Sequence, residues 1–203
     1  MHWQAIRAVR TSFGSRPNKY AINEEEDTQI RKSIMDGLIQ IDILQDLQLI
    51  LAWLIGKTFM LRGGGEHHEL TWDRFSFGSV TDGNFVGRPT VEFAMGFDKS
   101  HQLGITNPTT RTEKTRIFSM HNVNDPLSLY TLMQKYRAMC PPEQTRFYCY
   151  PLSQADIEFR TRYGIDYVSN PSRPLGINTI VKFSKVIAKK ANLTEWKRFT
   201  NHG

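Results

Sequence analysis

The chain has 203 residues, a formal net charge of +6, and a composition that is 39% hydrophobic and 11% aromatic. These values exclude a disordered chain, and the length suffices for one good core or for one domain plus a fragment of another. The positive charge favours a polyanionic partner.

Two cysteines are too few for a disulfide framework, so Cys140 and Cys149 are expected to be reduced and structural. The apolar run 49–55 is too short to span a bilayer, which predicts no membrane partner.

Residues 1–38 are predicted to form an N-terminal helical segment, and residues 39–203 the main domain. Asn23 is a predicted N-cap, and Glu26 stands at the capping-box position three residues later. A helix is therefore expected to begin at this point, and Gly37 marks its expected end.

Residues 43–60 are the most apolar helix candidate. Leucine and isoleucine recur at helical spacing along one face, and further apolar residues widen that surface. This segment is predicted to be the central core helix.

Three strands of an antiparallel sheet are predicted between residues 69 and 121. Leu70, Trp72 and residues 75–77 suggest the first strand, the second covers 90–97 with alternating apolar residues, and the third covers 116–120. A turn signal at 81–84 connects the first two strands.

The C-terminal half is predicted to continue with a helix over 126–139 and an extended segment over 146–150. Residues 156–174 read as irregular. A basic amphipathic helix follows, with Asn178 as its expected N-cap. Helices, a small sheet of about three strands and further helices predict an α+β fold that is mostly helical.

Positive charge is concentrated at the C-terminal end. Residues 178–203 contain six basic residues against one acidic residue, a net charge of +5, and leave the rest of the chain close to neutral. A DNA backbone would suit this segment, although lysines on a solvated helix face are common in any protein. The basic residues are Lys182, Lys185, Lys189, Lys190, Lys197 and Arg198.

The segment from Leu61 to Trp72 joins the core helix to the sheet. Arg62 offers a planar fork of donors for a phosphate, and the glycines 63–65 permit close approach of the backbone. The alternative is that Arg62 pairs with a nearby glutamate, Glu66 or Glu69, and only ties helix to strand. Because the glycines are expected to precede a strand rather than a helix, they do not form a P-loop or dinucleotide loop.

The adjacent histidines His67 and His68 raise the question of a metal site. Trp72 occupies the place where the helical zinc motif would need a further histidine, and no matching ligand set accompanies the pair. Neither a metal nor another cofactor is therefore expected. One histidine of the pair is expected to orient the segment by hydrogen bonds while the other is exposed.

The pattern Leu-Arg-Gly-x-x-Glu-His-His-x-Leu-x-Trp over residues 61–72 resembles the first catalytic box of Crypton-type tyrosine recombinases. It also resembles the related domain of MYM-type zinc-finger and glutamine-rich nuclear proteins. The resemblance implies that Arg62 holds the scissile DNA phosphate, that double-stranded DNA is the partner and that the protein is nuclear. Assembly of several copies on the DNA stays open.

Further boxes of this family have counterparts later in the chain. The family's hairpin lysine is best matched by Lys99, with Lys114 as the alternative. The triplet Thr200-Asn201-His202 resembles the segment that leads into the His-x-x-Arg box, so His202 matches the histidine of that box. Residues 147–151 are similar to a Phe-Tyr-Leu-x-Pro strand of the family.

The resemblance implies metal-free cleavage and rejoining of DNA through a phosphotyrosine intermediate. Arg62 would stabilise phosphate charge, Lys99 would protonate the leaving hydroxyl, and His202 would act as acid, base or donor. The second arginine and the nucleophilic tyrosine have no matching residue within the 203, so strand transfer by this chain alone is not expected. Residues 1–38 would be a remnant of a core-binding domain.

Three interpretations stay open: a truncated recombinase, a domesticated non-catalytic nuclear module that binds DNA or protein, and a structural α+β domain unrelated to DNA.

Overall fold

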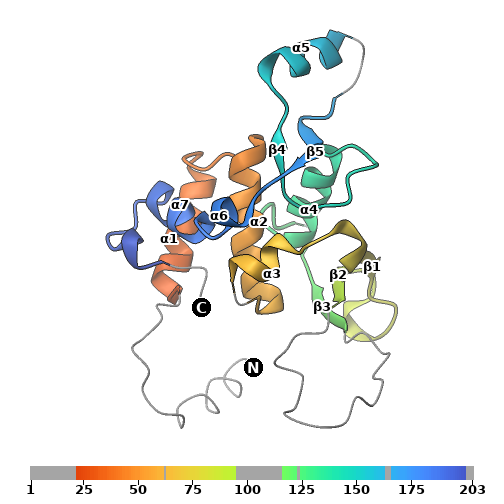
Figure 1. Ribbon diagram of the computed structural model, residues 1–203. Coiled ribbons are helices and arrows are strands. Elements are labelled where there is room, and N and C mark those ends of the chain that lie inside the picture. Colours follow the sequence, from red (N-terminus) through yellow and green to blue (C-terminus); the bar gives the residue numbers. More distant parts are fainter. Residues whose placement is uncertain (1–21, 62, 95–115, 123, 163–165, 200–203) are drawn as a thin grey trace, which may run out of the picture.

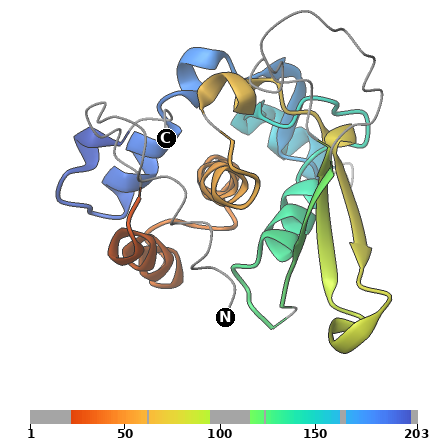
Figure 2. The same cartoon turned by 90° about the horizontal axis from the view of Figure 1, so that it is seen from below.

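The computed structural model describes residues 22–61, 63–94, 116–122, 124–162 and 166–199 (Figure 1). Within these ranges the fold is α+β, with several helices and a three-stranded antiparallel sheet, as the sequence predicts. Figure 2 shows helix α2 end-on in the middle, with α1 and the C-terminal helices on one side and α4 with the sheet on the other.

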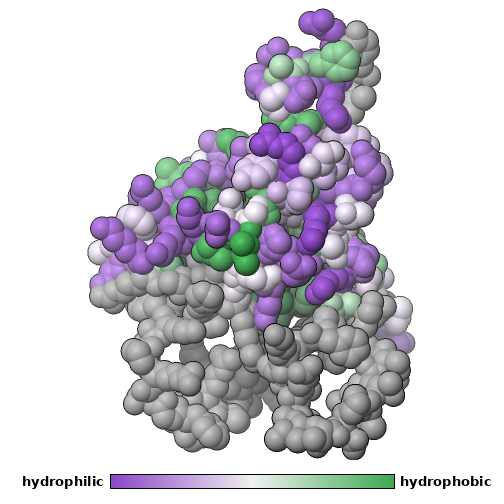
Figure 3. Space-filling model, viewed as in Figure 1, coloured by the Kyte–Doolittle hydropathy of each residue, from purple (hydrophilic) through white to green (hydrophobic). Residues whose placement is uncertain are grey.

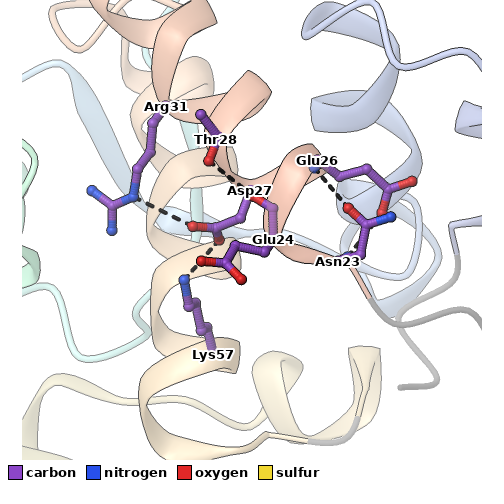
Figure 4. Close-up of polar contacts among 7 residues, drawn as sticks. All are labelled: Asn23, Glu24, Glu26, Asp27, Thr28, Arg31 and Lys57. Carbon is purple, nitrogen blue, oxygen red and sulfur yellow. Dashed lines mark hydrogen bonds and ion pairs between the residues drawn. The ribbon is translucent and has the colours of Figure 1, made fainter. Parts of the chain in front are cut away.

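Helix α1 (Glu24–Met35) has the predicted start and end. The Asn23 side chain accepts a hydrogen bond from the backbone of Glu26, and the Glu26 carboxylate accepts one from the backbone of Asn23, both at 2.9 Å (Figure 4). At the other end Gly37 has φ +75°, and its N–H donates to the carbonyl of Ile34. The N–H of Leu38 donates to Ser33, which completes a Schellman motif.

An ion-pair cluster joins α1 to α2 (Leu44–Phe59). The carboxylate of Asp27 lies 3.5 Å from Arg31 on its own helix and 2.8 Å from the ammonium of Lys57 on α2 (Figure 4). The predicted central helix is confirmed, because twelve of the sixteen residues of α2 are buried and they touch elements on every side. Ile30 and Ile34 of α1 belong to the same buried cluster.

The sheet has the order β1-β2-β3, with strands β1 (Phe75–Ser79), β2 (Pro89–Ala94) and β3 (Arg116–Met120). Phe75 pairs with Phe93 in the register, and both rings contact Phe59 of α2, with centroids 6.2 and 5.1 Å away. The first strand begins later than predicted, because Trp72–Arg74 form a short 3-10 turn in place of strand. A second 3-10 turn covers Gly83–Phe85. The end of the predicted second strand, residues 95–97, lies outside the described residues.

Helix α4 (Leu129–Ala138) begins at Ser128, whose side chain accepts a hydrogen bond from Thr131. The extended segment after it is shorter than predicted: β4 covers Cys149–Pro151. A buried polar network lies where β4 meets α2 and α4. Gln48 donates to the hydroxyl of Tyr136 and to the carbonyl of Cys149, and that hydroxyl donates to the carbonyl of Phe147.

Three sequence-based expectations are wrong. The glycine stretch does not lead directly into a strand, because Gly64–His68 form a short helix, α3. The P-loop remains excluded for a different reason: the element before the glycines is helix α2, whereas a P-loop follows a strand.

Residues 156–174 are not irregular either. They contain most of helix α5 (Gln154–Arg162) and the strand β5 (Ser169–Pro174), which pairs antiparallel with β4. Ser153 and Asp156 exchange hydrogen bonds at the start of α5, which fixes its first turn. Together β4, α5 and β5 form an arm that extends away from the body of the molecule (Figure 1).

The basic C-terminal helix is divided, and Asn178 is not an N-cap. The chain forms α6 (Ile177–Ile180), with Gly176 in the N-cap position, and then α7 (Phe183–Lys190). The break falls at Val181, which packs against Gly64 of α3. The residue at the break thus contacts a segment more than one hundred positions away in the chain.

Candidate nucleic-acid interface

Helix α3 packs directly against α6, which brings the segment after Arg62 next to the basic C-terminal region. A Cβ on Gly64 would lie 2.3 Å from Cγ1 and 3.0 Å from Cα of Val181, so only glycine fits. The expected close approach of the backbone is therefore present at Gly64, whereas Gly65 has open space around it.

The three residues matched to the family's catalytic machinery, Arg62, Lys99 and His202, lie outside the described residues, as does Lys114. Their roles stay predictions, and so does the alternative in which Arg62 pairs with a glutamate. Glu69 does interact with described neighbours: His68 at 2.9 Å and Arg146 at 3.5 Å.

His67 is the histidine that orients the segment. Its side chain is buried, and Nδ1 shares a hydrogen bond of 3.1 Å with the Tyr148 hydroxyl. On the other side of the ring, Nε2 lies so close to α2 that a Cβ on Gly56 would come within 3.3 Å. Burial lowers the pKa of His67 to about 4, so the ring is neutral at pH 7. His68, by contrast, remains partly exposed.

The lysines of the C-terminal region lie mostly on the outer side of α7. Phe183, Ile187 and Ala188 face the core. Residues three and seven positions apart share one side of a helix, so the side opposite this core carries a row of exposed lysines. These are Lys182, Lys185 and Lys189.

Lys190 differs from its neighbours because its ammonium forms an ion pair with the buried carboxylate of Asp46 in α2. Asp46 also accepts a hydrogen bond of 3.0 Å from the backbone of Gln40. Lys190 therefore fastens α7 to α2 in the free protein, and its charge is engaged.

A short 3-10 turn, η5 (Trp196–Arg198), packs on α7 and extends the positive surface. The ammonium groups of Lys189 and Lys197 lie 5.4 and 5.7 Å from the centre of the Trp196 ring. These cation–π contacts hold two positive charges beside one aromatic ring. The side chain of Arg198 lies outside the described residues. We call Lys182, Lys185, Lys189 and Lys197 the lysine surface.

Two tyrosines near α3 are unsuited to act as nucleophiles. Tyr136 and Tyr148 are buried, hydrogen-bonded, and have pKa values raised well above the usual range by burial. Cys140 and Cys149 are likewise buried and free, as expected, and burial raises their pKa values to about 12 and about 11. Such thiols are unreactive.

Among the described residues no three His, Cys, Asp or Glu side chains gather in a way that could hold a metal ion. Within the same ranges no helix has the length and apolar character needed to cross a bilayer. No family model, no curated protein and no solved structure matches this chain.

The sequence pattern missed the partners that hold this region together. Asp46 and Tyr148 have no local motif, and their partners lie 144 and 81 positions away in the chain. One usable signal for these contacts is present in the sequence, the adjacent pair His67 and His68. One histidine of the pair is expected to form hydrogen bonds and the other to be exposed.

Proposed function

We propose that this chain is a tyrosine-recombinase-like domain that binds the backbone of double-stranded DNA through the lysine surface. The observation that carries the proposal is the exposed row of lysines on α7, with Lys197 beside it and no acidic residue in that helix. Phosphates attract such a row of point charges without regard to base sequence.

The neighbourhood of the lysine surface supports the same proposal. Because α3 packs on α6, the segment that begins after Arg62 adjoins the basic region, and the family resemblance assigns both segments to the DNA side. Neutral, buried His67 fixes α3 without adding charge of its own.

The proposed activity is binding rather than cleavage. The family reaction needs a tyrosine nucleophile, and the resemblance matches none of the chain's tyrosines to that position. Two of them, Tyr136 and Tyr148, are moreover buried and hydrogen-bonded. In a longer recombinase, Arg62, Lys99 and His202 would serve cleavage and rejoining. In a domesticated nuclear protein, the same surface would serve binding alone.

Fluorescence anisotropy with a labelled duplex tests the proposal. Replacing Lys185 and Lys189 together by glutamine is expected to weaken binding about tenfold or more, because two phosphate contacts are lost. The matched control is Lys32→Gln, which removes an exposed lysine of α1 that does not belong to the lysine surface. Equal affinity of the double variant and the control would contradict the proposal.

Lys190→Gln provides a second comparison. Because this lysine pairs with buried Asp46, its loss is expected to destabilise the fold by about 1–3 kcal/mol in chemical denaturation. Lys185→Gln is expected to change stability by less than about 0.5 kcal/mol. Equal stabilities of the two variants would show that the Asp46 pair does not fasten α7.

A further inference from the structure

Helix α5, at the end of the arm, is the most exposed of the longer helices that the structure describes. No residue of α5 is buried, and α5 has only nine residues. Isolated helices shorter than about 12–15 residues are marginal in water, and most helical stability comes from packing. Helix α5 therefore has most to gain from a contact beyond its own chain.

The two sides of α5 differ in exposure. Ile157 and Arg160 are partly buried on one side, and the opposite side is exposed. That exposed side consists of residues spaced at i, i+3, i+4 and i+7, which lie along one stripe of a helix. We call it the α5 face: Ala155, Glu158, Phe159 and Arg162.

The α5 face presents an aromatic ring to solvent. Phe159 is 62% exposed, while the aliphatic Ile157 lies on the inner side. In the space-filling view the tip of the arm shows hydrophobic colouring next to strongly hydrophilic residues (Figure 3). Aromatic residues and arginine are the side chains most enriched in protein interfaces.

The α5 face carries one acidic and one basic residue, so the charges of two copies of this face can complement each other. Glu158 lies one turn before Arg162, with Phe159 between them. The Glu158 carboxylate accepts a hydrogen bond of 3.3 Å from the neutral side chain of Gln154, which leaves its negative charge uncompensated. If two copies of this helix pack antiparallel about a two-fold axis, Glu158 of each copy faces Arg162 of the other. Phe159 then meets its own counterpart near the axis.

We propose that the α5 face is a self-association surface whose occupant is the same face of a second copy of this chain. A single pair of short helices buries less than about 1,200 Å², so the dimer belongs to the weak, transient class. The proposal does not depend on DNA binding, and it places the dimer contact on the arm rather than on the lysine surface.

Sedimentation equilibrium of the whole chain without DNA, over roughly 10–500 µM, tests this proposal. We expect the wild type to dimerise in this range. Glu158→Arg and Arg162→Glu should each weaken dimerisation about tenfold or more, because each places like charges opposite one another. Lys32→Gln on α1 is the control that should leave the dimer unchanged.

An equimolar mixture of the two reversed-charge variants gives the sharpest outcome. In the mixed dimer every acidic position again faces a basic one, so association should return to near the wild-type level. A wild type that stays monomeric over the whole range would overturn the proposal and leave the α5 face to another kind of protein. A mixture that associates no better than either variant alone would also overturn it.

Discussion

The helices α2 and α5 differ most strongly in how far their residues are buried. Twelve of sixteen residues of α2 are buried, whereas none of the nine residues of α5 is. Helix α2 is therefore held by packing, and α5 by its capping turn and by the strands at its base. The difference indicates that the body of the fold carries stability, while the arm is available for contacts with other molecules.

The largest expected effect contrasts these two helices directly. Leu51 of α2 is fully buried, so Leu51→Ala should destabilise the protein by about 3–5 kcal/mol through lost burial and a residual cavity. Phe159→Ala in α5 should cost less than about 0.5 kcal/mol, because that ring is mostly exposed. Urea denaturation of both variants at low protein concentration measures the loss of unfolding free energy. Similar losses for the two variants would contradict the contrast between α2 and α5.

A second prediction concerns pH and the buried histidine beside α2. The pKa of His67 is lowered from 6.5 to about 4 in the folded state, so the unfolded chain binds the proton first as pH falls. Stability from this group is fully present above pH 6.5 and is lost progressively towards pH 4, by about 3 kcal/mol in total. His121, whose pKa is also lowered by burial, adds a loss of the same sign.

The measurement is the unfolding free energy between pH 7 and pH 4 for the wild type and for His67→Gln. The variant should show a shallower dependence, since the remaining change comes from groups such as His121. Identical pH profiles for the two proteins would contradict the assignment to His67.

The third and smallest effect tests the contact between α3 and α6. Gly64→Ala should destabilise by about 1–3 kcal/mol because the new Cβ would overlap Val181. Gly65→Ala is the matched control, since its surroundings are open and alanine favours a helix. Combining Gly64→Ala with Val181→Ala should recover part of the loss, and strict additivity of the two changes would argue against the contact.

The parts of the fold with strong local signals could be predicted from the sequence. The capping box at Asn23, the Gly37 terminator, the core helix and the third strand all follow from patterns within a few residues. The arm could not be predicted, because β5 has the sequence Ser-Asn-Pro-Ser-Arg-Pro, which shows no alternation and is a strand only by pairing with β4.

The candidate interface was likewise only partly predictable from the sequence. The basic character of residues 182–198 is visible in composition alone. Which lysine forms an ion pair is not visible, because Lys190 pairs with Asp46, a residue 144 positions away, whereas Lys189 lies over the ring of Trp196. Likewise, the break between α6 and α7 falls at Val181, which is not a helix-breaking residue, and its contact with Gly64 is not visible in the sequence.

The salt dependence of duplex binding tests the central claim most directly. If the four lysines of the lysine surface each contact a phosphate, log K should fall with log salt concentration with a slope of about −3.5. The Lys185→Gln and Lys189→Gln double variant should reduce this slope to about half. A wild-type slope near zero, or a slope that the double variant leaves unchanged, would contradict the claim that this surface binds DNA.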